Sequence, residues 1–385
     1  MHICTVTPSY LPHFGGAEVG MHMVLSHLAQ TTQHRFSVIT STTNPDWPRQ
    51  EEIDGVMVYR YIRPRLWAKW FAPTLFGFRY NPGLIRRLQP DVLHISYLLP
   101  GGVSAWYTAR RRKIPVVLSL GGHDVYDPFN MPPWPLRRWM SHFIRRSPVI
   151  AVNSQWTKQY LVEQDRAAPE DIHVTGFGVD RTRFNPDIDG TRIREQYDIA
   201  PDTVLIFALQ RLELRKGVDV LLKAIALLQE PNFHVLVGGK GRDTDKIHQL
   251  AAALGIQDHV TFCGFVAEEE KPLYYAAADI FALHSYHEGL GIVLAEAAAC
   301  GKPLVATNAG GTTDIAIPGH TGLTVEPGKP EAFAAALAIL INDPEQRTMM
   351  GAAAATHAAA HFSIDRVAAS YLELFEQAPS SGSDS

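Results

Sequence analysis

The sequence predicts an α/β protein made of two doubly wound domains with parallel sheets. Three observations lead to this prediction. Short apolar runs alternate with amphipathic segments, several of these runs are nearly continuous, and the alternation restarts after a break near residue 178. Strands buried on both faces of a parallel sheet lose the apolar–polar alternation of half-exposed strands. Repeated strand–helix pairs of this kind form open sheets covered by helices.

The first half contains six candidate strands, each bounded by turn residues. These are Ile3–Thr7, Phe36–Thr40, Val56–Tyr61, Val92–Ile95, Val116–Leu120 and Val149–Val152. A helix is predicted over Ala17–Ala29, because its apolar residues recur at helical spacing and fall on one face.

The second half repeats the pattern after a Gly-, Pro- and Asn-rich break over residues 176–186. Its helix over Val218–Leu228 carries an apolar stripe. We expect an N-terminal domain over 1–177 and a C-terminal domain over 178–363. The helix 364–378 is expected to pack back on the first domain, and the tail 379–385 to be disordered. The candidate strands here are Val204–Leu209, His234–Val237, Val260–Phe262, Ile280–Leu283, Leu304–Thr307 and Leu323–Val325.

Composition excludes several classes of protein. With 46% hydrophobic and 19% charged residues, the chain has enough apolar material for sizeable cores and is not disordered. The longest apolar run, Ala332–Ile341, is about half of what a membrane-spanning helix needs. The start Met1–Val6 resembles a buried strand more than a secretory signal. Three isolated cysteines in apolar settings indicate a reducing compartment, so we expect a cytoplasmic protein.

The charge is unevenly distributed. Residues 1–150 carry 17 Lys and Arg against 8 Asp and Glu, and the remainder carries 18 against 31. Basic residues mix with aromatic ones over Arg63–Phe71, and further basic clusters lie at Arg110–Lys113, Arg137–Trp139 and Arg145–Arg146. Such a surface suits an anionic bilayer, although ordinary solvated helix faces would give the same pattern. No nucleic-acid-binding motif accompanies the charge.

Two glycine-containing turns in the first half follow strands. Gly15 and Gly16 come before a predicted helix, where backbone amides can approach an anion, although a plain turn would look the same. Neither the dinucleotide fingerprint nor a P-loop occurs, so dehydrogenases and P-loop NTPases are disfavoured. Gly121-Gly122 leads into His123 and Asp124 at the carboxyl end of a strand, the edge where open α/β sheets bind ligands.

The second half carries the more specific segments. Arg211 and Lys216 flank a strand end and a helix start, where two cations are disfavoured unless an anion such as a diphosphate joins them. Glu288 precedes a thin loop containing Gly289 and Gly291. Glu296 follows eight residues later inside an apolar helix, where a buried carboxylate needs a hydroxyl or cationic partner.

Together these motifs resemble family 4 of the retaining glycosyltransferases with the GT-B fold. The resemblance implies two Rossmann-like doubly wound domains facing across a cleft. It departs from the family's pattern at Gln210, where glycine usually precedes the arginine. The matching segments, in the family's order, are Tyr10–Glu18, Gly122–Asp124, Gly178–Asp180, Arg211 to Gly217, Gly264–Val266, Glu288 to Glu296 with Gly301–Thr307 and Gly310-Gly311, and Thr321–Leu323.

The resemblance implies a role for each of these residues. Arg211 and Lys216 would neutralise the donor's diphosphate and so make a metal unnecessary. Glu288 would bind hydroxyls of the donor sugar, and Glu296 the ribose. His123 would donate or accept a hydrogen bond with the donor sugar beside the reacting carbon, with Asp124 as a further candidate. The Val266 backbone would lie near the base. Amides of Gly289, Leu290, Gly291 and Ile292 would bind the sugar oxygens and the phosphates. Backbone groups of Gly15 and Gly16 would bind the diphosphate.

The predicted activity is retaining transfer of a hexosyl unit from a nucleotide diphosphate sugar to a hydroxyl acceptor. The acceptor is expected to be a lipid-linked or cell-envelope glycan, with peripheral membrane contact through the basic N-terminal domain at the cytoplasmic face. No cofactor is expected, because the nucleotide sugar is a co-substrate. The alternatives are a small soluble acceptor, a nucleotide-sugar epimerase of the same fold, and a non-catalytic sugar-nucleotide sensor.

Overall fold

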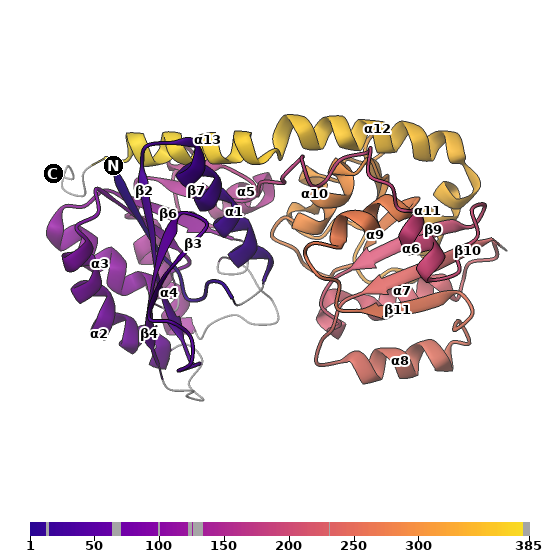
Figure 1. The fold of residues 1–385 in the computed structure, drawn as a ribbon, viewed down its shortest axis with the longest axis horizontal. Helices are drawn as coiled ribbons and strands as arrows, with labels where there is room; N and C mark the ends of the chain where they lie inside the picture. Colours follow the sequence, from indigo (N-terminus) through magenta and orange to yellow (C-terminus); the bar gives the residue numbers. More distant parts are fainter. Residues whose placement is uncertain are drawn as a thin grey trace. The chain divides into compact units, whose positions relative to one another are not determined.

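The computed structural model describes residues 1–12, 15–63, 71–98, 101–121, 125, 134–230 and 232–379. The chain divides into two compact units, which are considered separately below (Figure 1). The first unit is Met1–Gly178 with Ile364–Ser385, and the second is Val179–Ser363.

The first unit is built on an eight-stranded sheet of order β3-β4-β2-β1-β5-β6-β7-β8. All neighbours are parallel except β3 and β4. The strands are β1 (His2–Val6), β2 (Arg35–Thr42), β3 (Gln50–Ile53), β4 (Val56–Ile62), β5 (Val92–Ser96), β6 (Val116–Leu120), β7 (Ile150–Val152) and β8 (Ile172–Val174). The α-helices are α1 (Gly16–Thr31), α2 (Phe71–Leu88), α3 (Gly102–Arg112), α4 (Trp134–Ile144), α5 (Gln155–Glu163) and α13 (Ile364–Gln377).

Two of these strands were not predicted. β3 pairs antiparallel with β4 through a two-residue turn, in which Asp54 has φ 48° and Gly55 φ 81°. Both central residues of a type I′ hairpin turn need positive φ, which an Asp-Gly pair readily adopts. β3 is an edge strand whose only apolar residue is Ile53, and β8 is only three residues long, so neither forms a clear apolar run.

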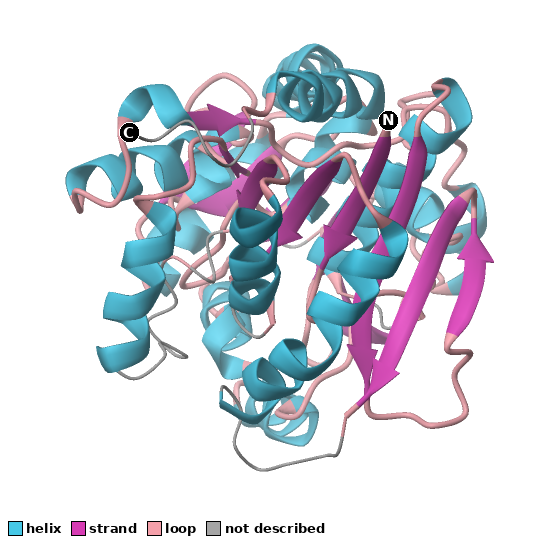
Figure 2. Cartoon of the chain, turned by 90° about the vertical axis from the view of Figure 1, so that its left-hand side faces the viewer, coloured by secondary structure: helices cyan, strands magenta, loops and turns pink. Residues whose placement is uncertain are grey.

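Helices cover both faces of this sheet. Residues of α3, α4 and α5 pack in one hydrophobic core with those of α2, and α1 and α13 build the core on the other face. In the view of Figure 2, helices lie in front of part of the sheet, and the strands toward the right are in full view. The rings of Tyr371 and Phe375 on α13 lie 5.7 and 5.4 Å from the ring of His94 on β5. Burial lowers the pKa of His94 to about 3, so this histidine is a neutral core residue.

The second unit contains a six-stranded parallel sheet of order β11-β10-β9-β12-β13-β14. Its strands are β9 (Val204–Leu209), β10 (Phe233–Gly238), β11 (Val260–Gly264), β12 (Ile280–Leu283), β13 (Leu304–Thr307) and β14 (Gly322–Val325). Its α-helices are α6 (Thr191–Gln196), α7 (Val218–Ile225), α8 (Thr244–Ala253), α9 (Lys271–Ala277), α10 (Ile292–Ala299), α11 (Pro330–Asn342) and α12 (Pro344–His361).

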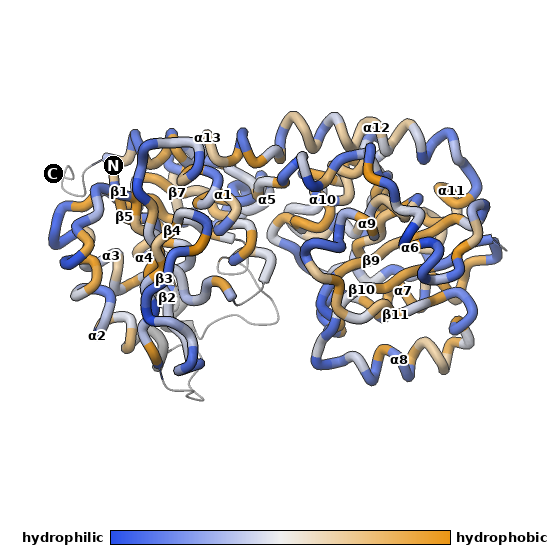
Figure 3. The backbone as a smooth tube through the Cα atoms, in the orientation of Figure 1, coloured by the Kyte–Doolittle hydropathy of each residue, from blue (hydrophilic) through white to orange (hydrophobic). Residues whose placement is uncertain are grey.

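The inner strands β9, β10, β12 and β13 of the second sheet are largely buried. They are mostly apolar, as the hydropathy colouring of β9 and β10 shows (Figure 3). One hydrophobic core contains residues of α7, α8 and α11. In a separate cluster, the aromatic rings of Phe207, Tyr275 and Phe281 lie 5.4–6.0 Å from one another. These two clusters fix the strands whose carboxyl ends carry the loops discussed below.

The folded units change the predicted charge balance. The first unit carries 20 Lys and Arg against 16 Asp and Glu, and the second carries 15 against 23. The excess of nine positive charges counted over residues 1–150 was therefore an overestimate for the domain, because residues 151–178 and the C-terminal segment bring carboxylates. Within the described ranges, no helix is both long and apolar enough to cross a membrane.

Candidate functional site

The candidate site of the second unit lies where the connectivity of the sheet changes direction. From β9 the chain moves outward to β10 and β11, and then returns to the other side of β9 to form β12. The loops after β9 and β12 therefore leave the sheet at the same edge in opposite directions. Open α/β sheets bind ligands at such a switch point. The sequence of these loops supplies Lys216 after β9 and Glu288 after β12.

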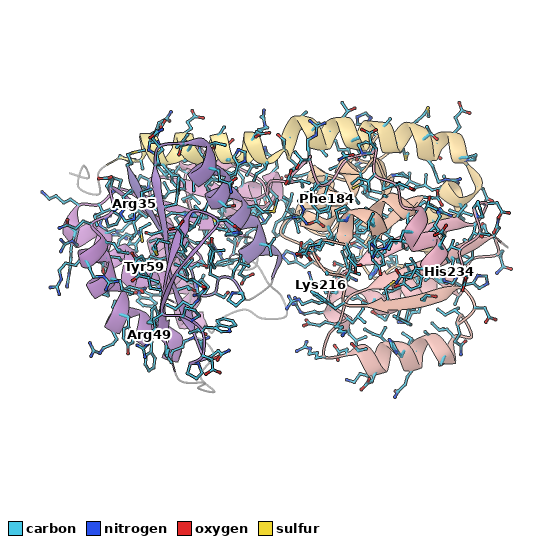
Figure 4. The ribbon with its side chains drawn as sticks, in the orientation of Figure 1. Arg35, Arg49, Tyr59, Phe184, Lys216 and His234 are labelled. Carbon is cyan, nitrogen blue, oxygen red and sulfur yellow. The ribbon has the colours of Figure 1, made fainter. Side chains whose placement is uncertain are left out.

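Lys216 and Glu288 form an ion pair. The Lys216 Nζ lies 2.5 Å from the Glu288 Oε1, although 72 residues separate them in sequence. Both residues are largely buried, with 7% and 9% of their surface exposed. The Ser285 hydroxyl donates a hydrogen bond of 2.7 Å to the same carboxylate oxygen. Figure 4 labels Lys216 beside the second sheet.

Gln210 connects the two loops through its side chain. Its Nε2 donates to the Lys216 carbonyl at 3.0 Å and lies 2.9 Å from the Nδ1 of His284, while its Oε1 lies 3.1 Å from the Ser285 hydroxyl oxygen. Its backbone N–H donates to Gly238 O, so the backbone at Gln210 still pairs with the end of β10 although glycine is usual at this position. The residue at which the chain departs from the family's pattern thus fixes Ser285 and the Lys216 backbone.

His284 is a buried neutral member of the same network. Burial lowers its pKa to about 4, against an opposing effect of hydrogen bonds from its ring to backbone carbonyls. Its Nδ1 also lies 3.1 Å from the Lys216 carbonyl. A Cβ at Gly217, where φ is 72°, would collide with the His284 carbonyl. Glycine is therefore required where the β9 loop crosses the start of the β12 loop.

The backbone of Glu288 is held by the loop after β13. Its N–H donates to Ala309 O at 2.9 Å, and its carbonyl accepts from Gly311 N at 3.1 Å. Gly310, with φ 78°, lies so close to this carbonyl that a Cβ would collide with it. Gly310 and Gly311, the glycine pair of the predicted motif, thus hold the backbone of Glu288 in place. Beyond it, Gly289, Leu290, Gly291 and Ile292 lead into α10, with Gly291 at its N-cap.

Glu296 lies in α10 and has partners of its own. Its Oε2 accepts a hydrogen bond of 2.6 Å from the Tyr275 hydroxyl, and its Oε1 lies 3.5 Å from Lys271 Nζ. Burial raises the pKa of Glu296, while Lys271 and Tyr275 act in the opposite direction. Burial lowers the pKa of Lys271, but Glu296 and Glu268 outweigh it, so the net shift is upward. Each of these two groups stabilises the charged form of the other across the 3.5 Å between Lys271 Nζ and Glu296 Oε1.

Arg211 occupies a different environment from Lys216. Its side chain is 63% exposed and lies 3.8 Å from Glu213, which also pairs with Arg215 at 2.5 Å. The structure therefore brings Lys216 and Glu288 together, whereas Arg211, in the same loop after β9, has a largely exposed guanidinium group.

The loop after β11 carries Val266, which is buried, and Phe265, which is 62% exposed. Sequence reasoning named Val266 and missed Phe265. The signal available in the sequence was an aromatic residue directly before Val266, which was expected to lie near the base. It also missed Gln210 as a participant, together with Ser285, Tyr275 and Lys271, whose contacts depend on distant strands.

In the first unit, Gly15 and Gly16 mark the switch point between β1 and β5, and α1 begins at Gly16. The Glu18 carboxylate lies over Gly15, where it would collide with any Cβ, and accepts a hydrogen bond of 2.5 Å from the Ser9 hydroxyl. His123 and Asp124 lie outside the described residues, as do residues 64–70 of the basic aromatic segment and residues 380–385 of the tail.

Among the residues that the structure describes, no cluster of His, Cys, Asp or Glu could hold a metal ion. The sequence contains two Asp-x-Asp strings of the kind that can bind a metal, Asp187–Asp189 and Asp243–Asp245, and both contain residues with local structural roles. Asp189 accepts hydrogen bonds from the backbone and hydroxyl of Thr191 at the start of α6, and Asp243 accepts one from Leu214 N.

Comparison with known protein families gives two matches that together span most of the chain. Residues 14–183 match the family described as Glycosyltransferase Family 4, and residues 189–357 match Glycosyl transferases group 1. The chain is 33% identical over 395 residues to D-inositol 3-phosphate glycosyltransferase of Corynebacterium jeikeium, covering 94% of this chain and 93% of that enzyme.

It is 28% identical to the GDP-mannose-dependent alpha-(1-6)-phosphatidylinositol monomannoside mannosyltransferase of Mycolicibacterium smegmatis, with 90% and 91% of the two chains covered. The structure of a sucrose-phosphate synthase from Thermosynechococcus elongatus superposes with a TM-score of 0.85, at 22% identity and 98% coverage of both chains. The predicted fold class, two Rossmann-like units of the GT-B type, is thereby confirmed.

Proposed function

We propose a specific transfer reaction from one premise: the chain belongs to glycosyltransferase family 4, whose members are retaining enzymes that use nucleotide sugars. We propose that it transfers a hexosyl unit from a nucleotide diphosphate sugar to a hydroxyl of a lipid-linked or cell-envelope acceptor. The buried Lys216–Glu288 pair at the β9–β12 switch point is the observation that carries this proposal.

The pair suits a donor that carries a diphosphate next to a sugar. Lys216 would move its charge toward the phosphate oxygens, and Glu288 would then accept hydrogen bonds from sugar hydroxyls. Arg211 would join by turning from its 3.8 Å contact with Glu213 toward the anion, because its side chain is 63% exposed. Cations that meet the developing charge of the leaving group stabilise the transition state without a metal.

Glu296 would bind the ribose while it keeps its present partners. A carboxylate offers about four acceptor sites, so Tyr275 and Lys271 leave room for a ribose hydroxyl. The Val266 backbone and the amides of Gly289, Leu290, Gly291 and Ile292 would bind the base and the phosphate and sugar oxygens. The roles of Gly15, Gly16, His123 and Asp124 in the first unit remain predictions.

In the proposed reaction, the bond between the anomeric carbon and the phosphate oxygen breaks while the acceptor oxygen bonds to that carbon from the same face. The acceptor's proton passes to the departing phosphate, and a nucleoside diphosphate is released. Glu288 is not the nucleophile of a two-step mechanism, because it would bind donor hydroxyls rather than attack the opposite face.

The acceptor proposal draws on two relatives whose names specify an inositol 3-phosphate and a phosphatidylinositol monomannoside. An acceptor with a lipid portion would be reached by peripheral contact with the cytoplasmic face of a membrane. The basic residues of the first unit would make this contact.

The test is release of nucleoside diphosphate from a panel of nucleotide sugars, starting with GDP-mannose, in the presence and absence of membrane lipid extract. Release that depends on the lipid extract, with a product of retained anomeric configuration, supports the proposal. Conversion of the nucleotide sugar to its epimer without any acceptor would support the epimerase instead. Failure of every nucleotide sugar to protect the protein against thermal unfolding would contradict both.

A further inference from the structure

A large groove lies between α2 and α3 in the first unit, with a volume of about 690 Å³. This volume is within the range of sites that bind small molecules. Its lining comes from one face of α2 and the facing side of α3. The lining residues are Phe78, Pro82, Gly83, Arg86, Ser104, Tyr107, Thr108, Arg111 and Arg112.

The two helices are in tight contact in one part and open in another. A Cβ at Gly77 would lie 2.9 Å from Gly101 Cα and 3.0 Å from Ser104 Oγ, so glycine is needed for this close approach. Asn81 fixes the contact, because its Nδ2 donates to Gly101 O at 3.1 Å and to Ser104 Oγ at 2.9 Å. At Gly83, by contrast, a Cβ would meet nothing within 4 Å. The groove opens from this point toward the helix ends.

The groove combines an apolar part with a cationic part. The rings of Phe78 and Tyr107, which are 40% and 39% exposed, lie 6.1 Å apart across the two helices. Arg86, Arg111 and Arg112 lie in the last turns of α2 and α3. This arrangement suits a molecule with a phosphate group joined to an apolar portion.

The part of the sequence that contains α2 and α3 is strongly basic. Positions 55–123 contain eleven Lys and Arg and a single acidic residue, Asp91, which accepts a hydrogen bond from the His2 backbone. Cations in the last turn of a helix are ordinarily favourable, but three guanidinium groups around one cavity also repel each other. An anion bound between them would relieve this repulsion.

The neighbouring arginines on the same helices have other partners. Arg87 lies 5.3 Å from the ring centroid of Tyr59, and Arg110 lies 5.0 Å from that of Trp106. Neither of them lines the groove. The two helices thus provide both groove arginines and matched arginines outside it.

The groove is separated from the edge where ligands of this sheet are expected. α2 and α3 each follow the carboxyl end of one strand and lead to the amino end of the next, so their last turns lie toward the amino edge of the sheet. The loops after β1 and β5 lie at the carboxyl edge, where open sheets bind substrates. A ligand in the groove would therefore be held apart from that edge.

We propose that the α2–α3 groove binds the phosphate headgroup of an anionic phospholipid and so attaches this unit to a lipid surface. The arginines bind the phosphodiester, and the glycerol and first methylene groups lie against Phe78 and Tyr107. The biological purpose rests on the proposed lipid-linked acceptor, whereas lipid binding is measured without any donor or acceptor.

The first experiment compares the full chain with two charge-matched variants by sedimentation with phosphatidylglycerol-containing vesicles. Arg86→Gln/Arg111→Gln removes two groove cations, and Arg87→Gln/Arg110→Gln removes two cations from the same helices outside the groove. At about fivefold per cation near an anionic surface, the groove variant should bind about 30-fold more weakly. The control should change by less than about threefold, because Arg87 and Arg110 lie over the rings of Tyr59 and Trp106 and not in the groove where the phosphate would bind. Equal losses in both variants would overturn the proposal in favour of diffuse attraction.

A third variant, Gly83→Trp, fills the open part of the groove without changing any charge. Its affinity for the same vesicles should fall about tenfold or more, because an occupied groove cannot admit the headgroup. Unchanged or increased vesicle binding would overturn the proposal. Circular dichroism and the thermal midpoint would establish that each variant is folded.

The ligand itself is tested with dihexanoyl phosphatidylglycerol below its micelle concentration and with inorganic phosphate. The short-chain lipid should bind at least about tenfold more tightly than phosphate, and Gly83→Trp should abolish the difference. Equal affinities would show a simple anion site and would overturn the lipid assignment. Nucleotide-sugar binding, measured on the same samples, should be unaffected, so a failure of the proposed transfer reaction would be recognised separately.

Discussion

Replacing Lys216 with methionine would leave the Glu288 carboxylate largely buried without its cation. The two side chains are 9% and 12% exposed, and their charged atoms are 2.5 Å apart. The Ser285 hydroxyl would still donate to the oxygen that Lys216 contacted. Breaking one side of a buried pair of this kind costs about 3–5 kcal/mol of folding free energy.

The double variant Lys216→Met/Glu288→Gln measures the interaction energy between the two residues, apart from the contribution of each residue alone. With both charges removed, no uncompensated buried charge remains, so the loss should be smaller than the sum of the two single losses by about 2–3 kcal/mol. The assay is urea unfolding of the full chain without ligand, with stability differences taken from midpoints at constant slope. Strict additivity of the two single effects would refute the coupling between Lys216 and Glu288.

Activity provides the second readout of the same variants. If Lys216 also meets the diphosphate, turnover of Lys216→Met should fall about 10²–10³-fold, and the double variant should not recover it even where stability returns. Recovery of turnover together with stability would assign Lys216 a structural role only.

Four further predictions concern other parts of the site. Gln210→Ala should lower turnover about tenfold, and adding Ser285→Ala should cause little further loss, because both act on Glu288 through one hydrogen bond; additive losses in a kinetic double-mutant cycle would argue against this. Phe265→Ala should weaken nucleotide binding about 5–100-fold in calorimetry, while Phe265→Tyr retains it, if the exposed ring stacks on the base. Stability should fall as pH drops from 6.5 toward 4, because His284 has a pKa of about 4 when folded and 6.5 when unfolded, so the unfolded state binds the extra proton; His284→Asn should flatten this part of the urea-midpoint profile. Activity should survive excess EDTA, and loss that Mg²⁺ restores would contradict the metal-free mechanism.

The periodicity of the sequence predicted the strands well where burial on both faces produces continuous apolar runs. The hairpin strand β3 was not predicted, because Gln50, Glu51 and Glu52 are polar and an edge strand needs no apolar face. Its Asp54-Gly55 turn was a usable signal, since this dipeptide favours a tight hairpin.

The sequence predicted which loops form the candidate site, but it did not predict which side chains contact each other there. Glycines and charges at strand ends identified the loops containing Lys216 and Glu288. The pairing of these two residues, and of Glu296 with Tyr275, depends on which strands are neighbours. Residues 72 and 21 positions apart in the chain meet only once the sheet order is known. Gln210 illustrates the same limit, because its effect arises from contacts with the loop after β12.

The return of α13 to the first unit has a consequence for synthesis on the ribosome. The first 178 residues emerge early, but α13 follows only after the 185 residues of Val179–Ser363. At about 5–20 residues per second, one face of the first sheet waits about 10–40 s for Val367, Tyr371 and Phe375 to cover it. A nascent chain of this protein therefore exposes an apolar surface until Val367, Tyr371 and Phe375 have been synthesised. A premature stop before Ile364 would leave the second unit complete and the first permanently open to chaperones and proteases.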